Sequence, residues 1–136
     1  MKLHYDIPAY DLTYAGEASS NVKKLLVQLG IDPVRVKKAA IAMYEAEINA
    51  VIHGNGGAAD VEISSGRIVI CISDKGPGIA DLELAMQEGW STASDEIREM
   101  GFGAGMGLPN MKRYADRLDI DTEVGKGTRV TITVNF

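Results

Sequence analysis

The sequence predicts an α/β fold, a two-layer sandwich in which helices lie on one face of a mixed, mostly antiparallel sheet. Short segments near both ends alternate apolar with polar residues, which is typical of half-buried strands. Two longer segments between them carry apolar residues at helical spacing. The length of 136 residues suits one domain, so we expect residues 1–136 to form a single unit.

The first part of the chain predicts a strand followed by two helices. Residues 3–7 alternate apolar and polar side chains, as a half-buried strand does. Helical spacing begins at about Thr13 and stops at Gly30, a residue common just after a helix. Asp32 and Pro33 then suit the cap and the first residue of a second helix, which continues to His53.

The rest of the chain predicts a hairpin, a glycine-rich region and a closing pair of strands. The second strand of the hairpin is apolar enough to be central in the sheet. We expect, in order, a hairpin within 61–73 that turns at 64–66, a glycine-rich loop at 75–79, a short helix near 81–87, a candidate lid at 88–105, a helix over 108–118, and strands over 119–123 and 128–135 around the turn 125–127.

Composition and charge exclude several functional classes. Fourteen basic against 19 acidic residues give a net charge of −5, the wrong sign for binding nucleic acid along its phosphates. No signal peptide or apolar stretch of about 18 residues is present, so we expect no membrane association. The lone Cys71 lies in an apolar run, and we expect a reduced, buried thiol and a cytoplasmic protein.

Glu45 and Asn49 stand four residues apart on the second predicted helix, so their side chains share one face, and His53 continues the row. A carboxylate can take a proton from an attacking hydroxyl. A carboxamide oxygen is a hard, neutral ligand that suits Mg²⁺. The pair therefore predicts either a catalytic site or, as the alternative, a polar stripe on a helix surface.

Glu47 and His53 give weaker functional predictions. Glu47 faces elsewhere, and we expect an ordinary solvated carboxylate there. His53 suits a partner of the helix C-terminal dipole or a partly buried hydrogen-bonding residue. A zinc ligand is disfavoured, because no second His or Cys stands at metal-site spacing.

Glycine-rich loops mark two further places. Asp74 begins DKGPGI just after the predicted central strand, where its carboxylate could accept from an amino group while the glycines admit a flat ligand; the alternative is a tight turn. GFGAGMGL, residues 101–108, alternates glycine with larger residues before a helix and could present N–H groups to phosphates. Neither the P-loop nor the dinucleotide-binding glycine pattern occurs.

Taken in order, EAEINAVIHG, DKGPGI, GFGAGMGL and GKGTRVTI resemble the four boxes of the gyrase, chaperone, histidine-kinase and MutL (GHKL) ATPase superfamily. The resemblance covers most of the chain. The single-domain form is similar to the anti-sigma serine/threonine kinases of bacterial partner-switching modules. GWSTAS and GAGMGLPNMKRYAD most resemble the stress-module switch kinases.

The resemblance implies a Bergerat ATP-binding fold that uses ATP and Mg²⁺. In that fold Glu45 would be the general base, Asn49 the Mg²⁺ ligand and Asp74 the acceptor for the adenine amino group. Gly76 and Gly78 would shape the adenine pocket. Further residues expected at the nucleotide are Ile79, Thr92, Gly101, Gly103, Ala104, Gly105, Met106, Gly107, Leu108 and Thr128, the last acting on the adenine side through its hydroxyl or a water.

The chain departs from this pattern between Thr92 and Gly101, where residues 93–100 are longer and more acidic than the lids of the nearest switch kinases. Arg98 could neutralise a γ-phosphate or could lie on a solvated lid helix. The same two alternatives hold for Lys75, Lys112 and Arg113.

The resemblance implies transfer of the γ-phosphate of Mg·ATP to a serine or threonine of a STAS-domain anti-sigma antagonist. One alternative is ATP-dependent sequestration of a sigma factor or regulatory enzyme with little kinase activity. Another is a stand-alone ATPase. A homodimer is also expected, since the anti-sigma members commonly pair and the strand at 3–7 offers an edge.

Overall fold

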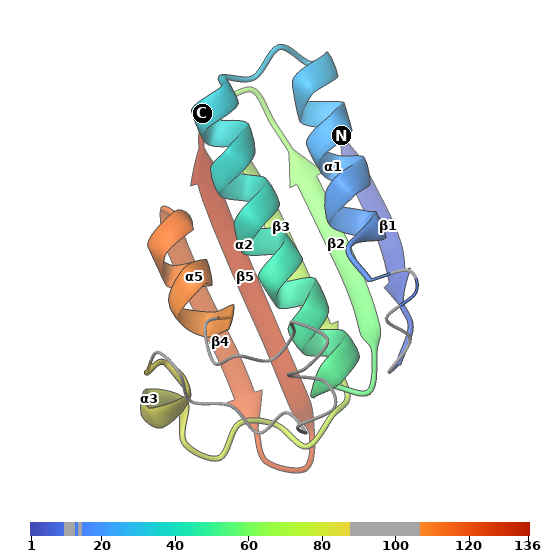
Figure 1. Ribbon diagram of the computed structural model, residues 1–136, viewed down its shortest axis with the longest axis vertical. Coiled ribbons are helices and arrows are strands. Elements are labelled where there is room, and N and C mark those ends of the chain that lie inside the picture. The colour runs from blue at the N-terminus through green and yellow to red at the C-terminus, as the bar shows by residue number, and fades with distance from the viewer. Residues whose placement is uncertain (10–12, 14, 88–106) are drawn as a thin grey trace.

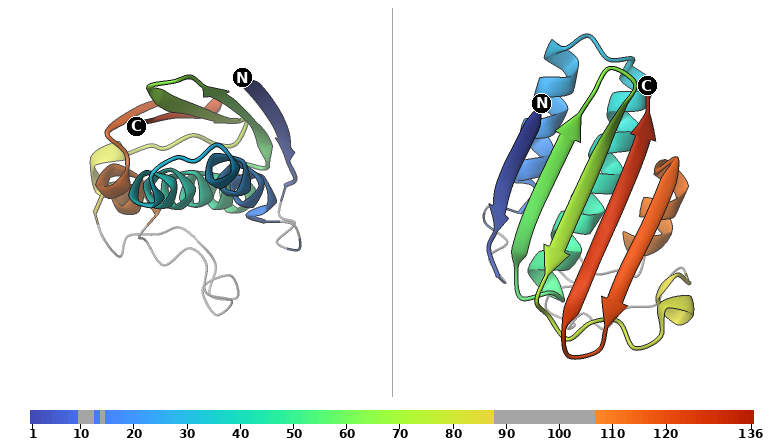
Figure 2. Two further views of the ribbon diagram at one scale, coloured as in Figure 1. Left: turned by 90° about the horizontal axis from the view of Figure 1, so that it is seen from above. Right: turned by 180° about the vertical axis from the view of Figure 1, so that it is seen from behind.

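Five strands of the computed structural model, which describes residues 1–9, 13, 15–87 and 107–136, form one sheet in the order β1-β2-β3-β5-β4. Helices α1, α2 and α5 cover one face of this sheet (Figures 1 and 2). The predicted two-layer sandwich is therefore confirmed. The elements are β1 (Lys2–Ile7), α1 (Glu17–Gln28), α2 (Pro33–Ile52), β2 (Gly57–Ile63), β3 (Arg67–Asp74), α3 (Leu82–Ala85), α5 (Gly107–Tyr114), β4 (Arg117–Glu123) and β5 (Gly127–Asn135).

All neighbouring pairs of described strands are antiparallel, so the expected mixed sheet is not observed. The connections explain this. Two helices separate β1 from β2. The chain therefore runs along the helical layer twice, in opposite directions, and enters β2 in the direction opposite to that of β1 (Figure 1). Strand β3 lies at the centre of the sheet, as its apolar sequence predicts, and β1 lies at an edge.

Local chemistry sets where the two long helices begin. Asp32 caps α2 by accepting the N–H of Val34 at 3.0 Å, and Pro33 occupies the first turn, as predicted. Helix α1 begins at Glu17 rather than near Thr13. Gly16, which precedes it, has a φ of 90°, outside the helical region.

Glu47 contradicts the prediction of a solvated carboxylate. Its side chain is only 3% exposed and accepts three backbone N–H groups at the start of α1. Gly16 and Ala18 donate to Oε2 at 3.1 and 3.2 Å, and Ser19 donates to Oε1 at 3.0 Å. The side of α2 opposite the Glu45 row thus faces α1, whose unpaired N–H groups attract a carboxylate.

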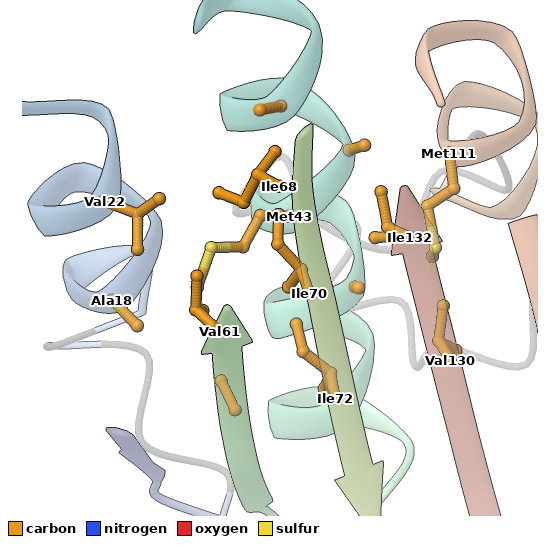
Figure 3. Packing of buried hydrophobic residues seen from close by; sticks show 14 of the residues in the cluster. Ala18, Val22, Met43, Val61, Ile68, Ile70, Ile72, Met111, Val130 and Ile132 are labelled. Carbon is orange, nitrogen blue, oxygen red and sulfur yellow. The ribbon is translucent and has the colours of Figure 1, made fainter. Parts of the chain in front are cut away.

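The core lies between the sheet and its helices (Figure 3). The strands contribute alternate side chains, such as Val61 of β2, Ile70 of β3 and Ile132 of β5. Met43 of α2 and Met111 of α5 pack against them with no exposed surface. Both helices are thereby fixed to the sheet, which holds the side chains on their remaining faces in place.

Three local predictions need correction. The helix expected over 108–118 ends at Tyr114, and β4 begins at Arg117. Leu118 and Ile120 alternate with exposed residues, so they follow the period of a strand. The short helix expected over 81–87 is reduced to α3. Cys71 is half-buried rather than buried, because its neighbours in β3 occupy the core face.

Among the described helices, none is long and apolar enough to cross a membrane. The candidate lid at 88–105 falls wholly outside the described residues, since positions 88–106 are not among them.

Candidate functional site

One face of α2 carries a row of half-buried polar side chains, Glu45, Asn49 and His53, as the spacing predicts. Glu45 and Asn49 face α5, which packs beside α2. His53, at the other end of the row, lies near Asp74 at the end of β3. Three elements that are distant in sequence therefore meet along a single polar line.

Glu45 lies at the α5 end of the row. Its Oε1 accepts a hydrogen bond from Nδ2 of Asn110 at 3.3 Å. Burial raises the pKa of the Glu45 carboxyl above its ordinary value, and the bond from Asn110 opposes that rise. A half-buried carboxyl group with a raised pKa suits a proton acceptor working near neutral pH.

Asn49 lies one turn further along α2, against the first residue of α5. A Cβ placed on Gly107 would lie 3.0 Å from both Oδ1 and Nδ2 of Asn49, closer than ordinary contact. Glycine at position 107 therefore lets the start of α5 approach the carboxamide. The polar carboxamide and the N-terminal end of a helix together form surroundings that suit anionic oxygens and a hard cation.

Asp74 lies at the third corner of the site. Its Oδ1 accepts the backbone N–H groups of Gly76 at 2.9 Å and Thr128 at 3.2 Å. Burial raises the pKa of this carboxyl, while the two N–H bonds and, least, the neighbouring His53 lower it. A Cβ on Gly54 would overlap the Asp74 side chain, so glycine there leaves room for the carboxylate.

His53 is half-buried at the C-cap position of α2, and its backbone N–H donates to the carbonyl oxygen of Asn49 at 2.8 Å. Burial lowers the pKa of the imidazole, against the opposing charge of Asp74. A neutral ring at pH 7 favours the interpretation of a partly buried residue over that of a charged partner of the helix dipole.

The DKGPGI loop is tied to the turn between β4 and β5. Gly78 has a φ of 78°, and a Cβ on it would overlap the carbonyl oxygen of Glu123. The N–H of Ile79 donates to Thr122 Oγ1 at 2.9 Å, and that oxygen lies 2.9 Å from Thr128 Oγ1. The loop is thus held against the β4–β5 turn, beside Thr128, whose N–H donates to Asp74.

Two residues of this arrangement, Thr122 and Asn110, were not singled out in the sequence. Thr122 pairs with Thr128 across the β4–β5 hairpin, so the signal appears only once the strand register is known. Asn110 stands three residues after Gly107, which is helical spacing, but its partner lies 65 residues away. Neither partner can be found from local sequence.

The other predicted site residues divide into three groups. Leu108 is 8% exposed and its side chain packs into the core, so only its backbone can face a ligand. Lys75, Lys112 and Arg113 are exposed. The residues outside the described part of the chain are Thr92, Arg98, Gly101, Gly103, Ala104, Gly105 and Met106.

Curated relatives of known name resemble this chain. An anti-sigma F factor of Clostridium beijerinckii is 35% identical over 112 residues, which are 78% of this chain and 73% of the relative. The serine/threonine-protein kinase RsbT of Bacillus subtilis is 29% identical over 125 residues, 89% of this chain and 86% of the relative.

Solved structures share the fold. The structure of the RsbU and RsbW domains of Rv1364c from Mycobacterium tuberculosis superposes with a TM-score of 0.66 at 18% identity, over 98% of this chain and 31% of that one. The SiaB-SiaC complex from Pseudomonas aeruginosa gives a TM-score of 0.64 at 14% identity, over 97% of this chain and 88% of that one.

The sequence model described as histidine kinase-, DNA gyrase B- and HSP90-like ATPase matches residues 35–136, which include Glu45, Asn49, Asp74 and all of α5. The chain therefore belongs to the histidine kinase-, DNA gyrase B- and HSP90-like (GHKL) ATPase family.

Proposed function

We propose that this protein is an ATP-dependent serine/threonine kinase of a partner-switching module, which transfers the γ-phosphate of Mg·ATP to a STAS-domain partner. The observation that carries the proposal is the half-buried Glu45 carboxylate one turn from Asn49, with both residues facing the glycine-marked start of α5. A relative that spans most of the chain, RsbT, is a serine/threonine-protein kinase.

The Asp74 corner suits the adenine ring. The N–H groups of Gly76 and Thr128 hold Oδ1, so the carboxylate is fixed and Oδ2 remains to accept from an exocyclic amino group. A Cβ on Gly76 would come within 2.6 Å of Gly54 Cα, so this close approach of two chain segments needs glycine. Gly78, Ile79 and Thr128 would complete the pocket.

The Asn49 end suits the phosphates. The carboxamide oxygen is a ligand that suits Mg²⁺, and N–H groups at the start of a helix such as α5 favour phosphate oxygens. The metal would neutralise charge on the phosphates when bound. Gly101, Gly103, Ala104, Gly105 and Met106 are proposed to follow the phosphates as a glycine-rich loop, with Thr92 nearby.

Glu45 would accept the proton of the attacking hydroxyl. The oxygen of a serine or threonine bonds to the γ-phosphorus, the bond to the β-phosphate oxygen breaks, and ADP leaves. The hydroxyl proton passes to the Glu45 carboxylate. Because the core fixes α2 and α5, the positioning of the reacting groups supplies much of the rate enhancement.

The partner is proposed from chemistry and from the relatives. Anti-sigma F factors among them favour a STAS-domain antagonist as phosphoacceptor, in the cytoplasm where ATP is available. The same relatives favour a second candidate function, ATP-dependent capture of a sigma factor or regulatory enzyme. A homodimer is proposed to form through β1, an edge strand of the sheet.

Transfer from γ-labelled ATP to a STAS-domain protein of the same genome tests the proposal. Glu45→Gln should bind ATP as wild type does yet lose transfer about 10²–10⁴-fold, because the base is gone. Glu62→Gln, an exposed change on β2, serves as the control and should transfer normally. Wild-type transfer by Glu45→Gln would reject the assigned base.

The same assay separates the competing functions. Partner capture that requires ATP, without phosphorylation, would favour sequestration over kinase activity. Phosphate release at the full rate with no partner present would favour a stand-alone ATPase.

A further inference from the structure

The first turn of α5 runs along the polar row of α2 in the opposite direction. Gly107 lies against Asn49, and Asn110 contacts Glu45. On α2 the two partners are four residues apart, about 6 Å along the axis, and on α5 they are three apart, about 4.5 Å. One turn of α5 therefore reaches both functional side chains of α2.

Asn110 is held in place by its neighbours. Leu108 and Met111, on either side of it in sequence, point into the core and are 8% and 0% exposed. Asn110 itself is half-buried, on the side of α5 that faces α2. Its side chain thus starts from an anchored helix, which limits the positions that its amide can take.

The contact with Glu45 has a defined chemical sense. An ionised carboxylate only accepts hydrogen bonds, so Asn110 must present its nitrogen to Oε1. Among the described residues, this bond is the one that opposes the effect of burial on the Glu45 carboxyl. The bond engages Oε1, one of the two carboxylate oxygens.

We propose that Asn110 is a positioning residue for phosphoryl transfer: its amide fixes Oε1 of Glu45, so that Oε2 faces the acceptor hydroxyl. This inference rests on the proposed function, in which Glu45 is the base. In this role Asn110 acts through the Glu45 carboxylate and not on the nucleotide or the acceptor. The contact also links the base to the same turn of α5 that adjoins Asn49.

Substitutions at Asn110 separate positioning from folding. Asn110→Leu removes the donor at similar volume, and Asn110→Gln keeps an amide. The free energy of a charge-assisted hydrogen bond corresponds to a change in rate of about tenfold or more. We therefore expect kcat to fall about tenfold in Asn110→Leu, with the KM for ATP nearly unchanged. Asn110→Gln should recover part of that loss.

A second readout needs no activity. We expect ¹³C NMR titration of labelled glutamate carboxyls in the nucleotide-free protein to give a Glu45 pKa about one unit higher in Asn110→Leu than in wild type. The acid limb of the kcat–pH profile should move in the same direction. Asn21→Leu, the same change at an exposed site of α1, should alter neither.

The outcomes separate the role of Asn110 from the role of Glu45. Loss of transfer in Glu45→Gln together with an unchanged Glu45 pKa and pH profile in Asn110→Leu would overturn this inference and leave the proposed function standing. Wild-type transfer by Glu45→Gln would overturn both. Should Asn110→Leu fail to fold, Asn110→Ala adds no volume and carries the same expectations.

Discussion

At the scale of single residues, Glu45 links burial to chemistry. Burial raises the pKa of its carboxyl, so the folded protein holds the proton more tightly than a free glutamate does. A general base works only when deprotonated, and activity must therefore be lost as the pH falls through this raised pKa. The direction of the shift predicts that the acid limb of the kcat–pH profile lies above the ordinary pKa range of a glutamate carboxyl.

The pH dependence of kcat for transfer to the partner checks this expectation. With ATP saturating at each pH, kcat should decline on the acid side at a higher pH than an exposed glutamate would give, about 4.3. An acid limb at or below that ordinary value would show that Glu45 is either not desolvated in the working protein or not the base.

Glu47 predicts an effect on stability instead. Glu47→Ala leaves three backbone N–H groups at the start of α1 without their carboxylate partner, two of them in buried hydrogen bonds. We expect the free energy of unfolding to drop by on the order of 3 kcal/mol, since each unsatisfied buried donor costs about 1–3 kcal/mol. Urea denaturation measures the change.

The matched control is Glu62→Ala on the exposed face of β2, which should change stability by about 0.5 kcal/mol or less. Equal stabilities for Glu47→Ala and Glu62→Ala would mean that the α1 cap contributes nothing.

The two glutamates also show how far sequence reasoning reaches. Glu45 and Asn49 could be predicted because helical spacing alone puts them on one face. Spacing also predicts that Glu47 points elsewhere, but what it meets there depends on how α1 packs. Asn110 was missed for the same reason, since its partner is brought close only by the tertiary fold.

At the scale of secondary structure elements, the close approach of α5 to α2 depends on Gly107. Gly107→Ala would place a Cβ 3.0 Å from the Asn49 carboxamide, so either the helix or the side chain must shift. We expect the Mg²⁺-dependent part of ATP binding to weaken several-fold, because a misplaced ligand loses affinity. Titration with ATP at several Mg²⁺ concentrations measures it.

Gly66→Ala is the control for this change. It lies in the β2–β3 turn, where an added Cβ meets nothing within 4 Å, and it should leave binding unaltered. Unchanged Mg²⁺ dependence in Gly107→Ala would contradict the view that Asn49 needs this approach.

Element boundaries were predictable where a local chemical signal marks them. Asp32 and Pro33 determine the start of α2 through a cap and a ring that both act within one turn. The end of α5 carries no such signal. Leu118 suits a continued helix as well as a strand, and its pairing opposite Ile132 of β5 decides for β4.

At the scale of the whole molecule, the fold brings distant sequence motifs to one end of the sandwich. Asp74 ends the central strand, Thr128 is the second residue of the neighbouring strand, and α2 lies over this sheet face (Figure 1). The layers and a mostly antiparallel sheet were predictable from the sequence, but the strand order β1-β2-β3-β5-β4 was not, because it depends on which strands become neighbours.

Calorimetric titration with ATP, with and without Mg²⁺, shows whether Asp74 and Asn49 belong to one ATP site. Asp74→Asn keeps an oxygen for the N–H groups of Gly76 and Thr128, so the loop should hold its shape. Its new amide nitrogen would face the adenine amino group, donor against donor.

We expect wild-type protein to bind ATP saturably and more tightly with Mg²⁺. Asp74→Asn should weaken binding at least about tenfold, the loss expected when a buried polar group is left unpaired. Asn49→Ala should lose the Mg²⁺ dependence, while Asp121→Asn, an exposed change on β4, should have no effect. Equal affinity in wild type and Asp74→Asn would contradict the account.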